Sequence, residues 1–312
     1  MKNIVAIGGG TGTFTILNAL KDGPVHLAAI ISMADDGGST GLLRDQYGVL
    51  PPGDVRRALV ALSESSQTMR DLFNYRFHSG DLKGHSFGNI FISVLEKVTG
   101  SFSSAVEEAS NILKIKVAVV PVTLDDIRLH ARLNNGKMVH GETNIDIPKT
   151  RERSPIKEVW LEPKARLNPR ARTILREADI VVIGPGDIYT SLIPNLLVTG
   201  MKEELKRSKA KKIYFCNLMT KKGETDHFDG NDFAREMEKY LGKDVLDYAV
   251  FNNRRPSPAV IKRYRAQGAE YIEPPKAKRN GATRYLFAPL IDSEPLLRHG
   301  PPKRLAKLLL SL

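Results

Sequence analysis

The stretch KNIVAIGGGTGTFTILNALKDGPVHLAAIIS, residues 2–32, decides the fold of this 312-residue chain. It begins with a continuous apolar run at 2–7, which leads into the glycine-rich segment 8–12. A segment with helical spacing follows at 14–21, and a second apolar run covers 25–32. Uninterrupted Val, Ile and Ala runs that alternate with helices are typical of parallel strands covered on both faces. The stretch therefore predicts a strand, a glycine loop, a helix and a second parallel strand.

After the second strand we expect a long loop. The same alternation then continues to the C-terminus, with a single helix at 195–208, except in one region. Around residues 125–161 the sequence DIRLHARLNNGKMVHGE alternates about an Asn-Asn-Gly turn, which indicates a β-hairpin. We find no fixed-period repeat and no low-complexity linker. We therefore expect one α/β domain over residues 1–312, with a doubly wound, mostly parallel, Rossmann-like sheet and a hairpin insertion. Residues 251–312 form its basic C-terminal section.

Composition excludes several classes of protein. The chain is 41% hydrophobic and 26% charged, which are ordinary globular values. No apolar run reaches the roughly 18–20 residues of a membrane span, and the first run meets glycine too early for a signal peptide. The single cysteine, Cys216, excludes an internal disulfide framework and a thiolate metal cluster. We expect a cytoplasmic protein that does not insert into a membrane.

The basic charge is concentrated at one end of the chain. The net charge is +12, and residues 251–312 carry 13 Lys and Arg against 4 Asp and Glu. Such an excess can be a solvated face, a site for an anionic ligand or a nucleic-acid surface. The chain has no zinc-finger, RRM or KH signature, so nucleic acid is the least favoured of the three.

Polar or glycine-rich segments follow five of the predicted strands. They are IGGGTG at 7–12, SMADDGGSTG at 32–41, IGPGDIYTS at 183–191, CNLMTKKGETD at 216–226 and FNNRRP at 251–256. In open α/β sheets, ligands bind in the crevice outside the carboxyl ends of the strands. The sequence therefore predicts one binding crevice lined by these segments.

The glycine loop is the first candidate site. Gly8, Gly9, Gly10 and Gly12, with Thr11, would let the backbone approach a phosphate at a helix N-terminus. The dinucleotide fingerprint G-x-G-x-x-G is incomplete, and no Walker A lysine follows. The alternative is a tight turn without a ligand.

Asp35 and Asp36 follow the second strand. They could contact a ribose or hold Mg²⁺ beside substrate phosphates, or they could act only as turn and capping residues. We interpret Asp54, in PPGDVRR, as the N-cap of the next helix. Three arginines could compensate these carboxylates or bind phosphate, namely Arg44, Arg56 and Arg57.

Further candidates lie in the later segments. His85 and Asn89 are four residues apart, which places them on one face if a helix starts there, and His85 is a general acid or base or a structural histidine. Tyr264 could stack on a base, and Arg298 could pair with a phosphate. The remaining candidate ligand contacts are Gly184, Gly186, Tyr189, Thr190, Asn195, Asn217, Thr220, Asn252 and Asn253. The other histidines lack metal-ligand spacing, and no Gly-x-Ser-x-Gly elbow appears.

Several blocks together resemble the YvcK branch of the CofD-like family, whose members are called gluconeogenesis factors. The blocks are IGGGTGT, ADDGGSTGLLR, LPPGDVRRALVALS, LFNYRF, GHSFGN, IGPGDIYTSLIPNLLV, NLMTKKGETD, FNN and LRHGP. They occur in order from residue 3 to the C-terminus. The resemblance implies a Rossmann-like fold that binds a UDP-N-acetylglucosamine-like nucleotide sugar. It also implies a bacterial, oligomeric (dimeric) protein with roles in carbon metabolism, cell-wall synthesis and cell shape.

The resemblance also bears on individual residues. It implies that Tyr264 and Arg298 contact the nucleotide sugar, beside the glycine loop and the strand ends at Asn217 and Asn252. One departure is Asp187, where the family pattern has serine. A carboxylate there would repel a phosphate unless a metal or an arginine intervenes.

Two functions remain open from the sequence. The favoured one is a non-catalytic, nucleotide-sugar-binding regulatory factor with protein partners in cell-wall synthesis. The alternative is a Mg²⁺-dependent, phosphate-linked group transferase of the 2-phospho-L-lactate transferase type, in which Asp35 and Asp36 hold the metal, and Asp36 and His85 are the candidate catalytic residues. A nicotinamide-dependent oxidoreductase is disfavoured by the incomplete fingerprint.

Overall fold

The first two apolar runs form neighbouring strands at the centre of a large sheet. The computed structural model describes most of the chain, namely residues 1–149, 153–291 and 302–312. Strand β1 pairs in parallel with β2, and Ala6 lies beside Ala29 with both side chains fully buried. Helix α1 connects the two strands, as the spacing predicts. The predicted α/β fold is confirmed.

The large sheet has eight strands, in the order β10-β11-β9-β8-β7-β1-β2-β3. All neighbours are parallel except β10 and β11. The strands are β1 (Lys2–Gly8), β2 (Val25–Ile31), β3 (Ala118–Pro121), β7 (Ile180–Ile183), β8 (Lys211–Phe215), β9 (Tyr248–Asn252), β10 (Arg279–Asn280) and β11 (Thr283–Ala288). The chain runs outward from β1 through β2 to β3, and then from β7 in the opposite direction. The strand order therefore reverses between β1 and β7, which is where such sheets bind ligands.

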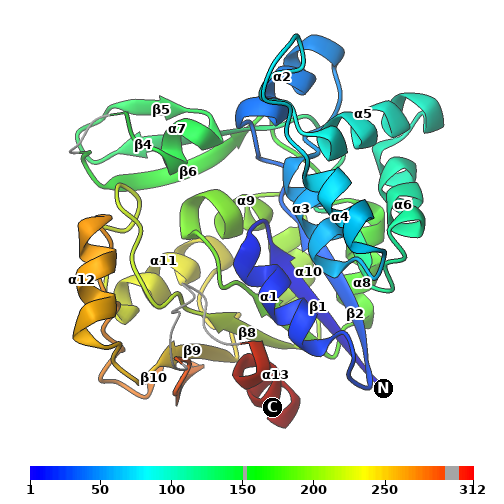
Figure 1. Cartoon of the computed structure of the whole chain (residues 1–312). Coiled ribbons are helices and arrows are strands. Elements are labelled where there is room, and N and C mark those ends of the chain that lie inside the picture. Colours follow the sequence, from blue (N-terminus) through cyan, green and yellow to red (C-terminus); the bar gives the residue numbers. More distant parts are fainter. Residues whose placement is uncertain (150–152, 292–301) are drawn as a thin grey trace.

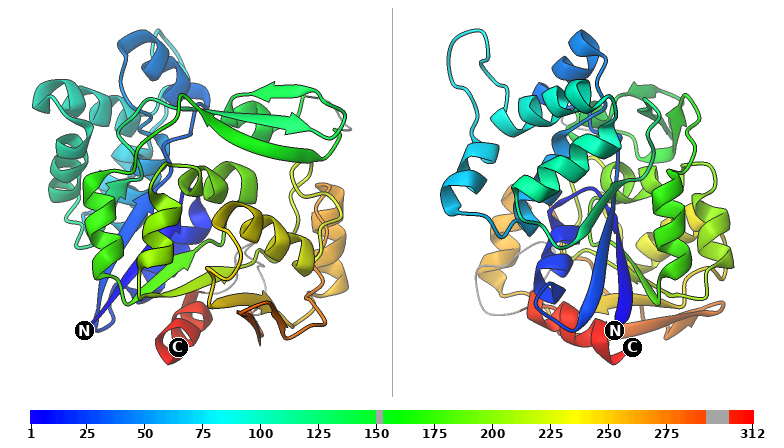
Figure 2. Two further views of the ribbon diagram at one scale, coloured as in Figure 1. Left: turned by 180° about the vertical axis from the view of Figure 1, so that it is seen from behind. Right: turned by 90° about the vertical axis from the view of Figure 1, so that its right-hand side faces the viewer.

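The strand side chains alternate between two apolar cores. Val181 and Ile183 of β7 belong to one core, and Ile180 and Val182 belong to the other. Helices cover both faces of the sheet, as the right-hand view of Figure 2 shows. The helices are α1 (Thr11–Leu20), α2 (Gly38–Tyr47), α3 (Gly53–Leu62), α4 (Gln67–Asn74), α5 (Phe87–Thr99), α6 (Phe102–Ile112), α7 (Glu142–Asp146), α8 (Pro169–Glu177), the π-helix η1 (Ile188–Leu192), α9 (Ile193–Leu196), α10 (Met201–Arg207), α11 (Gly230–Leu241), α12 (Pro258–Ala266) and α13 (Pro302–Ser311). None of the helices in the described ranges combines the length and the apolar character that crossing a bilayer requires.

A second, three-stranded antiparallel sheet is formed by the predicted hairpin and one further strand. Its order is β5-β4-β6, with β4 (Arg128–Leu133), β5 (Met138–His140) and β6 (Ile156–Glu162). The hairpin is confirmed, since β4 and β5 pair across the Asn-Asn-Gly turn. Figure 1 shows this small sheet at the top of the molecule, opposite the N-terminus at which β1 begins. It therefore lies at the carboxyl ends of the main strands.

Several elements differ from the sequence expectation. The segment after β2, expected to be a long loop, contains helix α2. The single helix expected around residues 195–208 is split into α9 and α10, because Gly200 adopts a positive φ of 100° between them. Strand β11, which extends the sheet beyond β9, was not anticipated. All three differences depend on tertiary packing or backbone conformation, which the spacing of apolar residues along the sequence does not reveal.

A hydrogen bond between Val159 and Tyr240 joins the small sheet to α11, and substitution of Tyr240 tests this anchor. The Val159 N–H on β6 donates to the Tyr240 hydroxyl on α11 at 2.9 Å. We expect Tyr240→Phe to leave this N–H unpaired and to lower the free energy of unfolding by about 1–2 kcal/mol in urea denaturation. The Val159 amide should also exchange faster with deuterium. Tyr248→Phe on β9, whose hydroxyl bonds to none of the described residues, is the matched control and should change little. An unaltered Val159 exchange rate in Tyr240→Phe would contradict the proposed anchoring.

Candidate functional site

The predicted strand ends meet at the carboxyl edge of the main sheet. The Gly186 N–H donates to the Asn217 side-chain oxygen at 3.0 Å, and the Asn217 amide nitrogen donates to the Gly186 carbonyl at 2.9 Å. Asn217 therefore joins the turn after β7, which also contains Gly184, to the end of β8. Since β1 and β7 are neighbours, this joined edge lies beside the glycine loop.

The glycine loop ends β1 and begins α1. Gly10 is the N-cap of α1, and no side chain caps the helix. A Cβ atom on Gly9 would lie 2.6 Å from a carboxylate oxygen of Asp54, and one on Gly10 would lie 3.3 Å from the Ser191 hydroxyl. Glycine at these two positions lets α3 and η1 approach the loop closely. The first N–H groups of α1 thus form an uncapped, positively polarised end at the switch point of the sheet.

Asp35 and Asp36 hold backbone segments together. Asp35 accepts from the Gly37 N–H at 3.1 Å and from the Thr40 hydroxyl at 2.9 Å. Asp36 accepts from the backbone N–H groups of Glu142 and Thr143 at 3.0 and 2.8 Å. Asp36 therefore caps the first turn of α7 and connects the end of β2 to the insertion. Metal binding by this pair stays a prediction.

The expectation that Asp54 is an N-cap is wrong. Pro52 occupies the N-cap position of α3, and Asp54 lies in the first turn with its carboxylate paired to Arg57. The helix starts earlier because Pro52 already has a helical backbone conformation, with φ −81° and ψ −12°. Burial raises the pKa of Asp54 to about 7, although Arg57 opposes the shift. Asp54 is therefore a buried acid beside the glycine loop.

Glu142 is a site residue that the sequence did not reveal. It begins α7 within the insertion, and α7 contacts η1, the helix that follows β7. Burial, followed by the negative charges of Asp35, Asp54 and Asp36, raises the pKa of Glu142 to about 9. At neutral pH Glu142 therefore retains its proton. Its position 106 residues from Asp36 explains why no local motif identified it.

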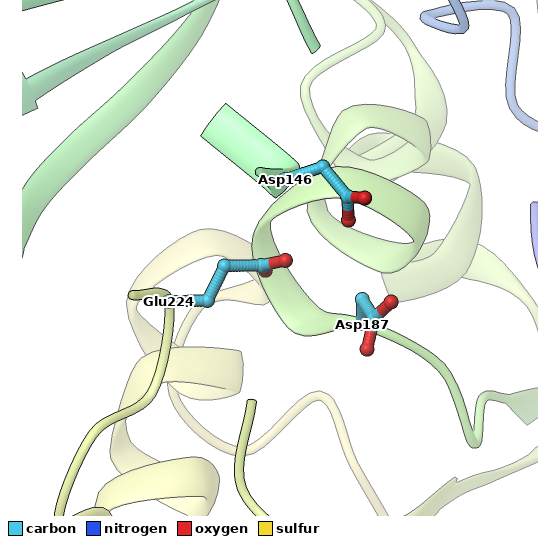
Figure 3. Close-up of side chains that lie close together, drawn as sticks. All are labelled: Asp146, Asp187 and Glu224. Atoms are coloured by element: carbon cyan, nitrogen blue, oxygen red, sulfur yellow. The ribbon is translucent and has the colours of Figure 1, made fainter. Parts of the chain in front are cut away.

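A lysine lies between three carboxylates at the centre of the edge. The Lys221 ammonium contacts Asp146 of α7, Asp187 at 2.7 Å and Glu224 at 3.0 Å. Figure 3 shows the three carboxylates converging from separate segments. The Thr190 hydroxyl donates to the carboxylates of Asp146 and Glu224 at 3.4 and 3.3 Å. Lys221 thus compensates the unexpected Asp187, in place of the metal or arginine that the sequence suggested.

This carboxylate cluster bears on metal binding. Within the described ranges, Asp146, Asp187 and Glu224 are the one group of three His, Cys, Asp or Glu side chains whose ligand atoms lie within 4.8 Å of one another. The ammonium of Lys221 already contacts all three carboxylates. Asp35 and Asp36 belong to no such group, so a metal beside them would need further ligands from a bound molecule or water.

The GHSFGN segment lies against α2. Ser86 is the N-cap of α5, and its hydroxyl oxygen accepts from the Asn89 N–H. His85 therefore precedes the helix, and His85 and Asn89 do not share a helical face. The buried His85 ring lies 3.2 Å from the Ser39 hydroxyl through Nδ1, and the Asn89 amide donates to the Thr40 hydroxyl at 3.4 Å. Both residues therefore support α2, and an acid–base role for His85 stays a prediction.

Arg44 is a buried structural cation. Its guanidinium donates to the Asp35 carbonyl at 3.0 Å and to the Ile127 carbonyl at 2.5 Å, and it pairs with Asp126. The side chain is 1% exposed, so these partners leave little room for a phosphate. Burial lowers the pKa of Arg44 in spite of Asp126.

The other predicted contacts lie in diverse surroundings. Tyr189 and Asn195 are buried, and burial raises the pKa of the Tyr189 hydroxyl. The Thr220 hydroxyl accepts from the Glu270 N–H at 2.8 Å, and Asn252 accepts from the Leu290 N–H at 2.9 Å. Asn253 is exposed, Tyr264 is half-buried on α12 below the Arg263 guanidinium, and Arg298 lies outside the described residues. Ligand contacts by these residues stay predictions.

Removal of the Lys221 charge should destabilise the junction. In Lys221→Gln, three carboxylates lose their shared cation, and we expect the free energy of unfolding at pH 7 to fall by about 3–5 kcal/mol. Urea denaturation at pH 7 measures the effect. Lys116→Gln, which removes an exposed lysine paired with Glu64, should cost less than about 1 kcal/mol. Similar losses in the two variants would contradict the role of Lys221.

The raised pKa of Glu142 predicts a pH-dependent stability difference. The folded state favours protonated Glu142, so its contribution is complete below pH 4.5 and is lost as the pH rises towards 9. Relative to the wild type, Glu142→Gln should therefore gain stability from pH 5 to 9, by less than about 1.4 kcal/mol per pH unit. Urea denaturation across this range measures the difference. Glu203→Gln, on the exposed face of α10, should give a constant difference. A constant difference for Glu142→Gln would show that the glutamate is already ionised.

Comparisons with known proteins agree with this geometry. The family of 2-phospho-L-lactate transferase CofD matches residues 4–288. The "Gluconeogenesis factor" of Bacillus subtilis is 40% identical over 273 residues, which cover 86% of this chain and 84% of that protein. The "Gluconeogenesis factor" of Halalkalibacterium halodurans is 39% identical over 306 residues, covering 97% and 94%. A crystal structure of a UPF0052 family member from Bacillus halodurans has a TM-score of 0.92 at 35% identity, covering 99% of this chain and 100% of that chain. The chain therefore belongs to the CofD family, as its sequence blocks indicate.

Proposed function

We propose that the protein is a regulatory factor that binds a UDP-N-acetylglucosamine-like nucleotide sugar in the crevice beside the glycine loop. The observation that carries this proposal is the uncapped N-terminus of α1 at the point where the strand order reverses. A ten-residue helix directs backbone N–H groups and a partial positive charge at a phosphate there. Gly9 and Gly10 provide the close approach that a diphosphate needs.

The surrounding carboxyl groups suit the sugar end of such a ligand. Asp35, Asp54 and Glu142 lie close enough to influence one another's charge, and they offer oxygen acceptors to sugar hydroxyls. Protonated Glu142 can also donate one hydrogen bond. Tyr264 is the proposed stacking partner of the base. The crevice thus combines a phosphate-facing helix end with groups that recognise hydroxyls.

The relatives' names support a link to carbon metabolism, since those of Bacillus subtilis and Halalkalibacterium halodurans are called gluconeogenesis factors. We extend the proposal to a cytoplasmic, dimeric regulator that acts with protein partners in cell-wall synthesis and cell shape. These finer roles follow from the family resemblance of the sequence blocks.

We propose Mg²⁺ as the cation that accompanies the nucleotide. Asp54 and Glu142 are acids whose pKa values are raised by burial and by neighbouring carboxylates, so a divalent cation would offset an existing excess of negative charge. Carboxylate oxygens are hard donors of the type that Mg²⁺ prefers. Asp35 and Asp36, beside these acids, would hold the ion next to the ligand phosphates, where it would neutralise phosphate charge.

Calorimetry tests nucleotide-sugar binding. UDP-N-acetylglucosamine should bind more tightly than millimolar, and UDP-glucose, UDP and UMP rank the contributions of sugar and phosphate. Gly10→Ala should fold, because its Cβ would meet only the Ser191 hydroxyl at 3.3 Å, but it should weaken binding at least tenfold by crowding the phosphate. Gly23→Ala, at the opposite end of α1, is the control. No binding by the wild type, with or without Mg²⁺, would contradict the proposal.

A Mg²⁺-dependent group transferase is the second candidate. The match to the CofD family favours it, together with the proton held by Glu142 in the crevice. Incubation of the nucleotide sugar with protein, Mg²⁺ and a set of hydroxyl-bearing acceptors, followed by chromatography, separates the two functions. An unchanged ligand supports binding alone, whereas metal-dependent release of nucleotide that is lost in Asp36→Asn supports transfer.

A further inference from the structure

A pocket of about 200 Å³ lies among α2, α3 and α5. Three arginines line it, Arg56 and Arg57 from α3 and Arg76 from the segment after α4, together with Thr40 and Asn89. None of residues 8–12, all of which the structure describes, lines this pocket. Its volume is below the roughly 300–1,000 Å³ of sites for drug-sized ligands, so it suits a small charged group rather than a nucleotide.

Two of the three arginines lack a carboxylate partner. Arg57 is paired with Asp54. Arg56 donates to the side-chain oxygen of Asn74 at 2.7 Å, and Arg76 donates to the Gly84 carbonyl. Across the described parts of the chain, neither Arg56 nor Arg76 forms an ion pair. Burial, followed by the charges of Arg57 and Arg76, lowers the pKa of Arg56 to about 10. An anion between these guanidinium groups would offset their repulsion.

Buried polar atoms at the pocket also lack partners. The Arg56 Nε donor and the Asn89 Oδ1 acceptor form no hydrogen bond within the described structure, and Asn89 is only 4% exposed. An unpaired buried donor costs free energy, so a ligand oxygen at this position is favoured.

The position of Arg56 depends on a glycine. A Cβ atom on Gly88 would lie 2.8 Å from the Arg56 Cδ and 2.5 Å from the Phe73 carbonyl oxygen. Glycine at position 88 therefore lets the arginine lie across the start of α5. This packing holds the guanidinium at the pocket instead of letting it extend into solvent.

The remaining wall is compatible with an anion. Helix α2 begins at the pocket with Gly37 as N-cap and without a side-chain cap, so its first turn is positively polarised. Asp35 also lines the pocket, but its two oxygens accept from the Gly37 N–H and the Thr40 hydroxyl. These hydrogen bonds satisfy both oxygens of the Asp35 carboxylate with donors at the start of α2.

We propose that Arg56, Arg57 and Arg76 form a binding pocket for a phosphate monoester group, separate from the glycine loop. Guanidinium groups match phosphate oxygens through paired N–H donors. Here the guanidinium groups come from α3 and from the segment after α4, and they line a pocket at the start of α2. The pocket takes either inorganic phosphate or the phosphoryl end of a small phosphorylated metabolite. It goes beyond the nucleotide-sugar proposal, because it uses none of the residues of the glycine loop.

Titration with inorganic phosphate and with glucose 1-phosphate tests the pocket. In ¹H–¹⁵N spectra of the whole protein, phosphate should shift the Arg56 Nε–H resonance, assigned by its loss in Arg56→Lys. Arg76→Gln should weaken phosphate binding at least about tenfold, the effect of one charge-assisted contact. The phosphate affinity of Arg76→Lys, which keeps the charge but not the paired donors, should lie between those of the wild type and Arg76→Gln. A preference for glucose 1-phosphate identifies an esterified ligand, and a preference for inorganic phosphate identifies the free ion.

The matched control is Arg235→Gln, which removes the same charge from an exposed site on α11. Thermal melts should show that Arg76→Gln is folded, since Arg76 is exposed. Equal phosphate affinity in the wild type and Arg76→Gln, or equal weakening by Arg235→Gln, would overturn the proposal. Arg76-dependent phosphate binding without binding of UDP-N-acetylglucosamine would leave this pocket standing and refute the nucleotide-sugar function. Nucleotide-sugar binding without phosphate binding would support the nucleotide-sugar function and refute this pocket.

Discussion

The compensation of buried negative charge at the carboxyl edge of the main sheet constrains the rest of this structure. A carboxylate removed from water is costly unless a cation or several N–H donors surround it. Asp54 is compensated by Arg57, and Asp36 by backbone N–H groups of α7. Lys221 compensates three carboxylates from three segments. Asp54 and Arg57 lie one turn apart on α3. The contacts of Asp36 with α7 and of Lys221 with Asp146 and Asp187 join parts of the chain that are distant in sequence, so charge compensation and the placement of the insertion depend on each other.

The compensation is incomplete at two positions, and both lie beside the candidate crevice. Asp54 and Glu142 have raised pKa values because burial and neighbouring carboxylates outweigh their partners. Buried acids with raised pKa values beside an uncapped helix end are typical of a site that receives a ligand or a cation. The incomplete compensation of Asp54 and Glu142 thus distinguishes them, as candidate binding groups, from carboxylates whose charge is fully compensated.

Local sequence pattern predicted the elements whose determinants are local. The apolar runs at 2–7 and 25–32 identify central strands, and the Asn-Asn-Gly turn identifies the hairpin. Helix α2 was missed because its segment is polar and contains glycine, and its stability depends on the burial of Arg44 against Ile127. Glu142 was missed because its importance arises only when α7 folds onto the end of β2. Periodicity reports which face of an element is buried, but not which distant segment covers it.

The distribution of positive charge shows the same limit. Most of the net charge of +12 lies in residues 251–312, which made the tail the natural place to look for an anion site. Yet surface cations are hydrated and gain little from a ligand, whereas partly buried guanidinium groups without carboxylates gain more. Half-buried Arg56 meets this condition, and exposed Arg76 lines the same pocket without a carboxylate partner among the described residues. The aspartates of residues 35–57 are bound by backbone, hydroxyl or arginine donors. Arg56 and Arg76 instead line a pocket in which an anion would complete the charge balance.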